Sequence, residues 1–240
     1  MLKYDFDIIR EKPDRCAEKL SEGIVNSALI TSVDYAKGKG SWKLLPDICI
    51  AVDGAFKNIN LFFNKEIRDL HTVAVDNNDP TALALFRIIM QEKYEISPEL
   101  MSIDGSLNHK LTAADAALIS GNEAFNIQKN NKIFMDLGDE WSDLTGLPFV
   151  YGLWAVHEIG VNPEMVNRIR SVAGKNINDQ DNISEQIFKQ YGPDQMLYTK
   201  FISNSISYRL GLEEKEAINE FFRYAFFFGL IEHIPDLHFA

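Results

Sequence analysis

The chain has 240 residues, of which 46% are hydrophobic, and a formal net charge of -11. This length suits one large or two small domains, and the apolar fraction is ample for a core. The negative charge repels nucleic acid and anionic membrane surfaces at long range, so we expect neither as a partner. The longest apolar run, residues 225–231, is too short to span a bilayer.

The cysteines indicate a reducing compartment. Cys16 and Cys49 show no CxxC pattern and no metal-ligand spacing, so we expect both to remain thiols rather than to form a disulfide. The N-terminal sequence MLKYDFDIIREKPDRC contains no apolar segment typical of a secretion signal. These features predict a cytoplasmic protein.

Strand and helix signals alternate over the first two thirds of the chain. Strands are predicted at 4–9, 25–30, 48–52, 58–63, 71–76, 115–121, 132–136 and 149–156. Helices are predicted at 13–20, 30–37 and 79–94, with one further helical turn at 138–143. Alternation of this kind favours an α/β fold with a mostly parallel sheet covered by helices.

From Pro163 onward the pattern predicts helices only. In the last of them, five apolar residues recur at helical spacing and are expected to face the core: Ile218, Phe221, Phe222, Ala225 and Phe228. The polar stretch 174–182, GKNINDQDN, is predicted to be an exposed loop.

Several kinds of site have no motif in this sequence. The five histidines form no HxxxH or HExxH pattern, so a metal site is not expected. No GxSxG, GxxxxGK[ST] or GxGxxG sequence is present, so neither a catalytic triad nor a nucleotide cofactor is indicated.

Three junctions could instead bind an anion through backbone N–H groups at the start of a helix. They are Thr31–Ser32, residues 53–58 and residues 79–82. Each is also explained as an ordinary helix cap or turn, and singly that is the commoner case. All three follow predicted strands, and open parallel sheets bind ligands at this end of their strands.

The chain resembles the chorismate dehydratase family of the futalosine route to menaquinone. The resemblance rests on SALITSVDYA, IAVDGAFKNINLFF, VAVDNNDPTALALFRIIM, DAALISGNEAF, DLGDEWSDLTGLPFVYGLWAV and ISYRLG, in this order along the chain. It implies a two-lobed fold like the type II periplasmic binding proteins, with a helical C-terminal tail. Lobe one would comprise residues 1–67 and 148–240, and lobe two residues 68–147, with crossings at 64–69 and 145–149.

The resemblance also implies an activity. Members of the family convert chorismate to 3-enolpyruvylbenzoate by loss of water, in the cytoplasm and without cofactor or metal, so the expected partner is a small anionic carboxylate substrate. No catalytic residue is identified, and Trp141 is expected to pack rather than to bind. The residues expected to position the substrate are Thr31, Ser32, Asp53, Gly54, Asn58, Thr81, Ala82, Asn122, Thr145 and Gly146.

The sequence departs from the family in three places. The family begins with a strand and a tyrosine-leucine-asparagine loop, and nothing in the N-terminal residues corresponds to it. Gly54–Asn58 and Asp79–Ala82 replace the family's Gly-Pro-Val and Ser-Arg-Thr-Ser segments. Asp79 can cap the following helix and would oppose a ligand carboxylate there. The alternatives are therefore a catalytically impaired member that binds a small ligand between the lobes, or a fragment with neither property.

Overall fold

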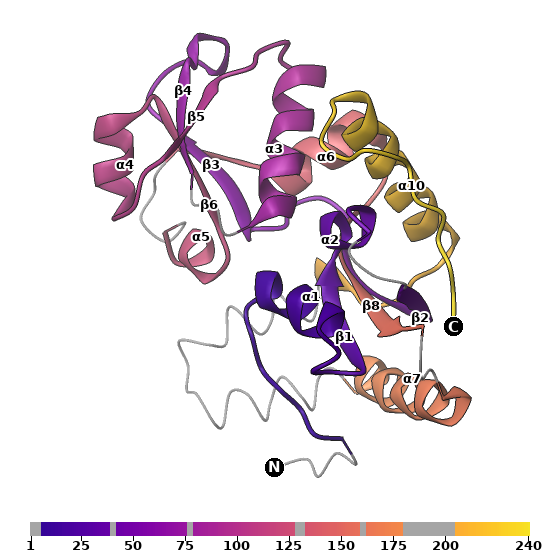
Figure 1. Cartoon of the computed structure of the whole chain (residues 1–240). Helices are drawn as coiled ribbons and strands as arrows, with labels where there is room; N and C mark the ends of the chain where they lie inside the picture. The colour runs from indigo at the N-terminus through magenta and orange to yellow at the C-terminus, as the bar shows by residue number, and fades with distance from the viewer. Residues whose placement is uncertain (1–5, 39–41, 76–78, 128–132, 159–161, 180–204) are drawn as a thin grey trace.

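The chain builds two β-sheets, one above the other in Figure 1, each covered by helices. This computed structural model describes residues 6–38, 42–75, 79–127, 133–158, 162–179 and 205–240. The four-stranded sheet has the order β1 (Ser27–Thr31), β8 (Phe149–His157), β2 (Trp42–Val52) and β9 (Ile206–Ser207). Every pair of neighbours in it is antiparallel.

The five-stranded sheet has the order β5 (Glu99–Ser102), β4 (Thr72–Val75), β6 (Ala116–Ser120), β3 (Ile59–Phe63) and β7 (Phe134–Asp136). Strand β4 is parallel to β5 and β6, whereas β3 is antiparallel to β6 and β7. The expected mostly parallel sheet is therefore wrong, because the described pairs of the four-stranded sheet are antiparallel and only two of the four neighbouring pairs in the five-stranded sheet are parallel. Sequence alternation does not reveal that β2 and β3, or β7 and β8, lie in different sheets although they follow one another along the chain.

Several helix ends coincide with local sequence signals. Pro13 and Pro80 occupy the first positions of α1 and α3, where a missing N–H is tolerated, and Gly146 ends α6 with a left-handed φ of 68°. The helical elements are α1 (Pro13–Ser21), α2 (Ser32–Ala36), η1 (Ile67–Asp69), α3 (Pro80–Glu92), α4 (Leu107–Ala113), α5 (Asn122–Ile127), α6 (Leu137–Thr145), α7 (Pro163–Asn178) and α10 (Leu212–Phe227).

The largest core cluster joins both sheets through α3, α6 and α10. At its centre the Trp141 ring lies 6.0 Å from Phe149 and 5.8 Å from Phe221. Trp141 is fully buried and donates its indole N–H to Pro148 O, which confirms that it packs. The apolar stripe expected on α10 is confirmed as well, with Phe228 partly buried and the other four residues buried.

The crossing between the lobes lies at a different place from the predicted one. Strand β3 pairs with β6 and β7, so the chain passes from the first sheet to the second within residues 53–58 and not at 64–69. The boundary at 67/68 is therefore wrong, since β3 belongs with the second sheet. The apolar run NINLFF fits either sheet equally well, which is why its pattern does not reveal the assignment. The return passes from β7 through α6 to β8.

Smaller predictions are also wrong. Residues 6–9 form no strand, and Ile8 and Ile9 are 59% and 50% exposed. Helix α7 continues through the predicted loop as far as residue 178, while 180–182 lie outside the described residues. Helix α6 is longer than one turn, and β9 interrupts the expected helical tail. Local propensities are weak, so the sequence pattern alone does not determine where such elements begin and end.

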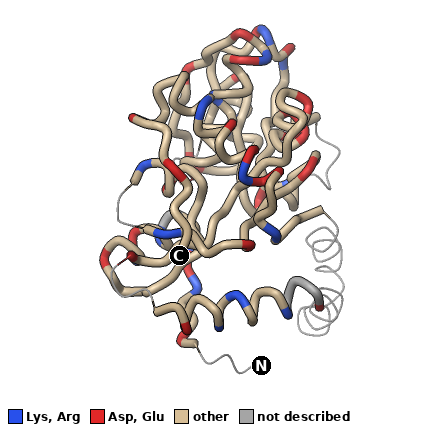
Figure 2. The backbone as a smooth tube through the Cα atoms, turned by 90° about the vertical axis from the view of Figure 1, so that its right-hand side faces the viewer, with Lys and Arg blue, Asp and Glu red and all other residues tan. Residues whose placement is uncertain are grey.

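Charge is distributed over the molecule. On the side shown in Figure 2, acidic positions occur in both the upper and lower parts, and basic positions recur along α7 near the bottom. No helix among the described residues is long and apolar enough to cross a membrane.

Candidate functional site

The start of α3 is closed by a side chain of the same segment. Asp79 is the N-cap, and its Oδ1 accepts a hydrogen bond of 2.9 Å from Ala82 N. The carboxylate also accepts one from the backbone N–H of Thr81. Asp79 therefore satisfies N–H groups that the first turn of a helix leaves without partners.

Two hydroxyls from other elements meet the same carboxylate. Tyr151 OH donates to Asp79 Oδ2 at 3.3 Å, and the side chain of Ser120, at the end of β6, donates as well. Tyr151 lies on β8 in the four-stranded sheet, whereas Asp79 and Ser120 belong to the part built on the five-stranded sheet. Asp79, Ser120, Tyr151 and the N–H groups of Thr81 and Ala82, here called the Asp79 cluster, thus connect the two sheets.

Thr31 and Ser32 lie beside the same strand. Thr31 pairs with Gly152 on β8, and Ser32 Oγ donates to Val150 O at 2.5 Å. Thr31 Oγ1 caps α2 by accepting from Asp34 N at 3.1 Å. Thr31 therefore lies next to Tyr151 in the sheet, Ser32 at the start of α2 bonds to the residue before Tyr151, and both hydroxyls already have protein partners.

Asn58 and Asn122 approach the cluster from the second sheet. Gly121 N donates to Asn58 O at 2.8 Å, and Ile59 pairs with Ser120. Asn122 is the first residue of α5 and is exposed. The two asparagines thus lie at the strand end that carries Ser120.

The segment 53–58 differs from its prediction, because it leads into strand β3 and not into a helix. Gly54 N donates to Ser142 Oγ at 2.9 Å, and Phe56 N and Lys57 N donate to the Asp136 carboxylate at 2.9 and 2.6 Å. These N–H groups therefore bind side chains of α6 and of its N-cap, Asp136, and are not available to a ligand anion. Asp53 is exposed at the end of β2.

Thr145 and Gly146 lie at the opposite end of α6 from Asp136. Thr145 Oγ1 donates to Trp141 O at 2.9 Å and accepts from Leu147 N at 3.1 Å, and Gly146 N donates to Ser142 O at 2.8 Å. These bonds form the C-terminal cap of the helix.

Burial and hydrogen bonding act on Asp79 in opposite directions. Burial raises the pKa of its carboxyl group, because a low-dielectric environment disfavours the charged form, while the hydrogen bonds from Ala82, Ser120, Tyr151 and Thr81 lower it. The pKa remains raised on balance. The cluster therefore holds a titratable acid between the two sheets.

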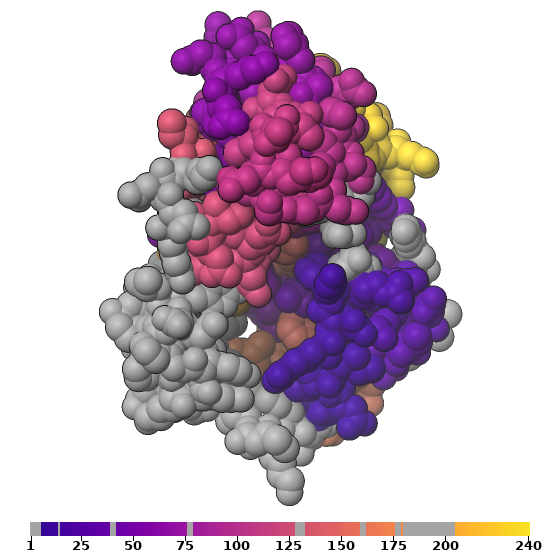
Figure 3. Space-filling view, turned by 90° about the vertical axis from the view of Figure 1, so that its left-hand side faces the viewer, coloured from indigo at the N-terminus to yellow at the C-terminus, as the bar shows by residue number. Residues whose placement is uncertain are grey.

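A hollow separates the two parts on the face shown in Figure 3. The magenta and pink second-sheet part lies above it, the indigo N-terminal part lies below, and orange atoms are visible deep inside. The sequence analysis did not single out Tyr151 or Ser120. The ring centroid of Tyr151 lies 5.5 Å from that of Phe56, a residue of the predicted junction 53–58. A tyrosine within the otherwise apolar run FVYGLWAV was an available signal, because its hydroxyl needs a partner when the ring is buried.

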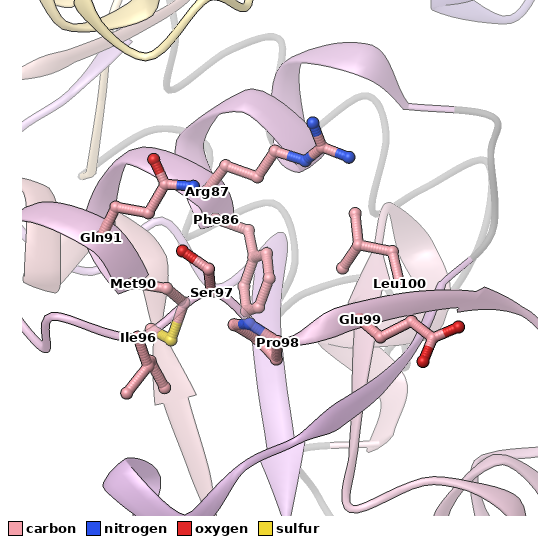
Figure 4. Close-up of a pocket in the computed structure, with 9 residues that line it drawn as sticks. All are labelled: Phe86, Arg87, Met90, Gln91, Ile96, Ser97, Pro98, Glu99 and Leu100. Carbon is pink, nitrogen blue, oxygen red and sulfur yellow. The ribbon is translucent and has the colours of Figure 1, made fainter.

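A separate pocket of ≈ 270 Å³ lies between α3 and the segment before β5. Its apolar lining includes Phe86, Met90, Ile96, Pro98 and Leu100. In Figure 4 the charged ends of Arg87 and Glu99 extend away from Phe86. None of the predicted site residues lines this pocket. Across the described part of the chain, no three His, Cys, Asp or Glu side chains gather as metal ligands would.

Comparison with solved structures shows the fold. Protein AF1704 from Archaeoglobus fulgidus is similar with a TM-score of 0.72 and 20% identity, over 92% of this chain and 86% of that chain. The periplasmic aliphatic sulphonate binding protein SsuA from Escherichia coli is similar with a TM-score of 0.66 and 12% identity, over 94% and 82%. The two-lobed fold like that of the periplasmic binding proteins is thereby confirmed.

Sequence comparison gives the family. The chorismate dehydratase of Thermus thermophilus is 25% identical over 231 residues, which cover 89% of this chain and 83% of that protein. A family model described as menaquinone biosynthesis matches residues 1–226. The chain therefore belongs to the menaquinone biosynthesis family.

Proposed function

We propose that this protein is a hydro-lyase of menaquinone biosynthesis, which removes water from chorismate to give 3-enolpyruvylbenzoate. The observation that carries the proposal is the similarity to a chorismate dehydratase along 89% of the chain. Membership of the menaquinone biosynthesis family supports the same pathway.

The chemistry makes modest demands on the protein. Chorismate loses its ring hydroxyl and one ring hydrogen as water, and the ring becomes aromatic, so the driving force lies in the substrate. The protein has to hold the ring in one orientation and assist transfer of the proton from carbon to the leaving hydroxyl. The proposal includes no cofactor and no metal.

We place the substrate in the hollow between the two sheets. On this proposal Thr31 and Ser32 position the substrate from the side of the four-stranded sheet, where Thr31 pairs with Gly152 and Ser32 bonds to Val150, the neighbours of Tyr151 on β8. Asn58, Asn122 and the first turn of α3, with Thr81 and Ala82, would position it from the side of the five-stranded sheet. Asp53 and Gly54 belong to the crossing segment that positions Phe56, and Thr145 and Gly146 are not needed for this placement.

The proposal is tested by incubating the purified chain with chorismate and separating the products by liquid chromatography with mass detection. We expect 3-enolpyruvylbenzoate to form well above the spontaneous breakdown of chorismate, at about 1 per second for an ordinary metabolic enzyme. Consumption of chorismate at the rate seen with heat-denatured protein would contradict it. Saturable binding of chorismate without turnover would support the alternative, a family member that only binds a small ligand.

A variant pair tests the location. Asn122→Ala removes an exposed amide at the start of α5, so we expect kcat/KM to fall about tenfold, the effect of losing one hydrogen bond of ~1.4 kcal/mol. Asn64→Ala removes an exposed amide whose side chain contacts Leu111 O at 3.5 Å, and should leave kcat/KM unchanged. Equal values for both variants would argue against this placement.

A further inference from the structure

Two groups that can exchange a proton face one another where the two parts of the molecule meet. Tyr151 OH donates to Asp79 Oδ2 at 3.3 Å. Tyr151 lies on β8 in the four-stranded sheet, and Asp79 is the N-cap of α3 in the part built on the five-stranded sheet. Both residues are partly exposed. A ligand held in the hollow between the same two parts (Figure 3) would therefore approach a carboxylate and a phenol that are already in contact.

The hydrogen bond within this pair is long enough to change partners. Its length of 3.3 Å exceeds the range of about 2.5–3.0 Å that is usual for O–H···O bonds. The carboxylate is also held by Ala82 N at 2.9 Å and by donors from Thr81 and Ser120. If Tyr151 turns its hydroxyl hydrogen toward a ligand, Asp79 therefore stays in place, and its Oδ2 gains a lone pair that can accept a proton.

The surroundings of Asp79 suit a general base. Burial is the largest influence on the pKa of its carboxyl group and raises it, so the group holds a proton more strongly than an ordinary aspartate does. Tyr151 is the titratable side chain that contacts it, and the other described donors to it are uncharged: Ala82 N, Thr81 N and the hydroxyl of Ser120. A proton on Asp79 can therefore pass directly to Tyr151.

The proposed substrate can meet such a pair without placing a carboxylate on Asp79. In chorismate the ring hydroxyl and the enolpyruvyl ether are trans on neighbouring carbons. The hydroxyl and the hydrogen of the ether carbon therefore lie on the same face of the ring. The enolpyruvyl carboxylate extends from the opposite face, and the other carboxylate is attached at the far end of the ring from the hydroxyl. A ring that presents its hydroxyl face to the pair keeps both carboxylates away from Asp79.

We propose that Asp79 and Tyr151 are the catalytic acid–base pair of the dehydration. Asp79 Oδ2 accepts the hydrogen of the ether carbon as a proton, and the electron pair of that C–H bond enters the ring. The bond from the ring to the hydroxyl breaks as Tyr151 donates its proton to the leaving oxygen, which departs as water. The proton on Asp79 then passes to the Tyr151 oxygen, which regenerates both groups. The inference rests on the proposed function, which supplies the substrate.

Two variants remove one member of the pair each. Tyr151→Phe deletes the hydroxyl and keeps the ring, and Asp79→Asn deletes the base while keeping a good N-cap for α3. Tyr94→Phe is the matched control for the first, because it deletes another hydroxyl that donates to a carboxylate, Glu140 Oε2 at 2.7 Å, between α3 and α6. Asp69→Asn is the control for the second, because it deletes an exposed acid. Circular dichroism melting shows whether each variant is folded.

The experiment is steady-state dehydration of chorismate over a range of pH, with the product measured by liquid chromatography. We expect kcat to fall about 10²- to 10³-fold in Tyr151→Phe and in Asp79→Asn, with KM changed by about threefold or less and no change in either control. Wild-type kcat/KM should fall as pH decreases through the pKa of Asp79, because a protonated carboxyl group cannot accept the ring hydrogen. This dependence should be absent from the residual activity of Asp79→Asn.

The outcomes separate this inference from the proposed function. A folded Tyr151→Phe or Asp79→Asn that retains kcat within about threefold of wild type overturns the acid–base pair alone. A lowered kcat with an unchanged dependence on acid pH in Asp79→Asn also overturns it, because that result assigns Asp79 a structural role. Wild-type protein that fails to dehydrate chorismate overturns the proposed function and this inference together. One folded variant of the pair is sufficient for the decision.

Discussion

The carboxylate of Asp136 accepts a hydrogen bond of 2.6 Å from the backbone N–H of Lys57, a residue in the segment by which the chain leaves the first sheet. The same carboxylate accepts from Phe56 N at 2.9 Å and, as N-cap of α6, from Gly138 N at 2.9 Å and Asp139 N at 3.3 Å. One side chain therefore ties the outgoing crossing to the beginning of the return.

Asp136→Asn should weaken this tie. An amide has one acceptor oxygen and a donor NH₂ group that would face N–H groups, so some of the four hydrogen bonds must be lost. We expect the free energy of unfolding to fall by about 2–4 kcal/mol, measured by urea denaturation. Asp139→Asn, an exposed acid in the first turn of the same helix, is the control and should change stability by about 0.5 kcal/mol or less.

A substitution at Gly138 tests how closely the start of α6 approaches the crossing segment 53–58. A Cβ at this position would lie 2.7 Å from Gly54 O and 2.8 Å from Phe56 N, and both atoms are backbone. Gly138→Ala should therefore destabilise the protein by about 1–3 kcal/mol through overpacking. Gly174→Ala is the opposite case, since Gly174 lies within α7 with nothing near its added Cβ, and should stabilise by about 0.5–1 kcal/mol. Thermal or urea unfolding that gives both changes the same sign would contradict the geometry.

Asp115 should make stability depend on acid pH. Its carboxylate accepts from His71 N at 2.9 Å and Thr72 N at 3.1 Å and lies 2.5 Å from Lys65 Nζ, and these interactions hold its pKa well below the usual range. A lowered folded-state pKa contributes stability above the unfolded value of about 3.9, and this contribution is lost as pH falls through the folded value. Wild type should therefore exceed Asp115→Asn in stability at pH 7, with a gap that narrows below about pH 4. A gap in urea unfolding that does not depend on pH would refute this.

The two thiols should react differently. Cys49 is 1% exposed, and burial raises its pKa to about 12, whereas Cys16 is partly exposed. We expect a disulfide reagent to leave Cys49 unmodified in the native protein and to modify both cysteines after denaturation without reductant. Failure of either thiol to react in denaturant would instead indicate a disulfide or another modification.

The sequence predicted local elements better than their assembly. Pro80 and the apolar spacing after it located α3, and the stripe on α10 located its buried face, because both signals lie within one segment. The crossing at 53–58 was not predicted, because the pairing of β3 with β6 depends on residues about 60 positions away. The cytoplasmic location remains a prediction.

The same limit applies to the candidate site. Thr31, Asn58 and Thr81 were predicted from junctions that follow predicted strands, because strand ends are visible in a sequence, and their roles stay predictions. Tyr151 was not, since its role depends on meeting Asp79, a residue 72 positions earlier in the chain. Residue-level roles in binding stay predictions until the variants are measured.

The position of β8 between β1 and β2 has a consequence for how the protein is made. The five-stranded sheet is formed by one continuous stretch from β3 to β7, so it can be completed as soon as Asp136 has been synthesised. Strands β1 and β2 emerge earlier, yet both pair with β8, which begins only at Phe149. During synthesis the edges of β1 and β2 therefore stay unpaired while the second lobe folds. These two strands are consequently the segment that a chaperone would protect.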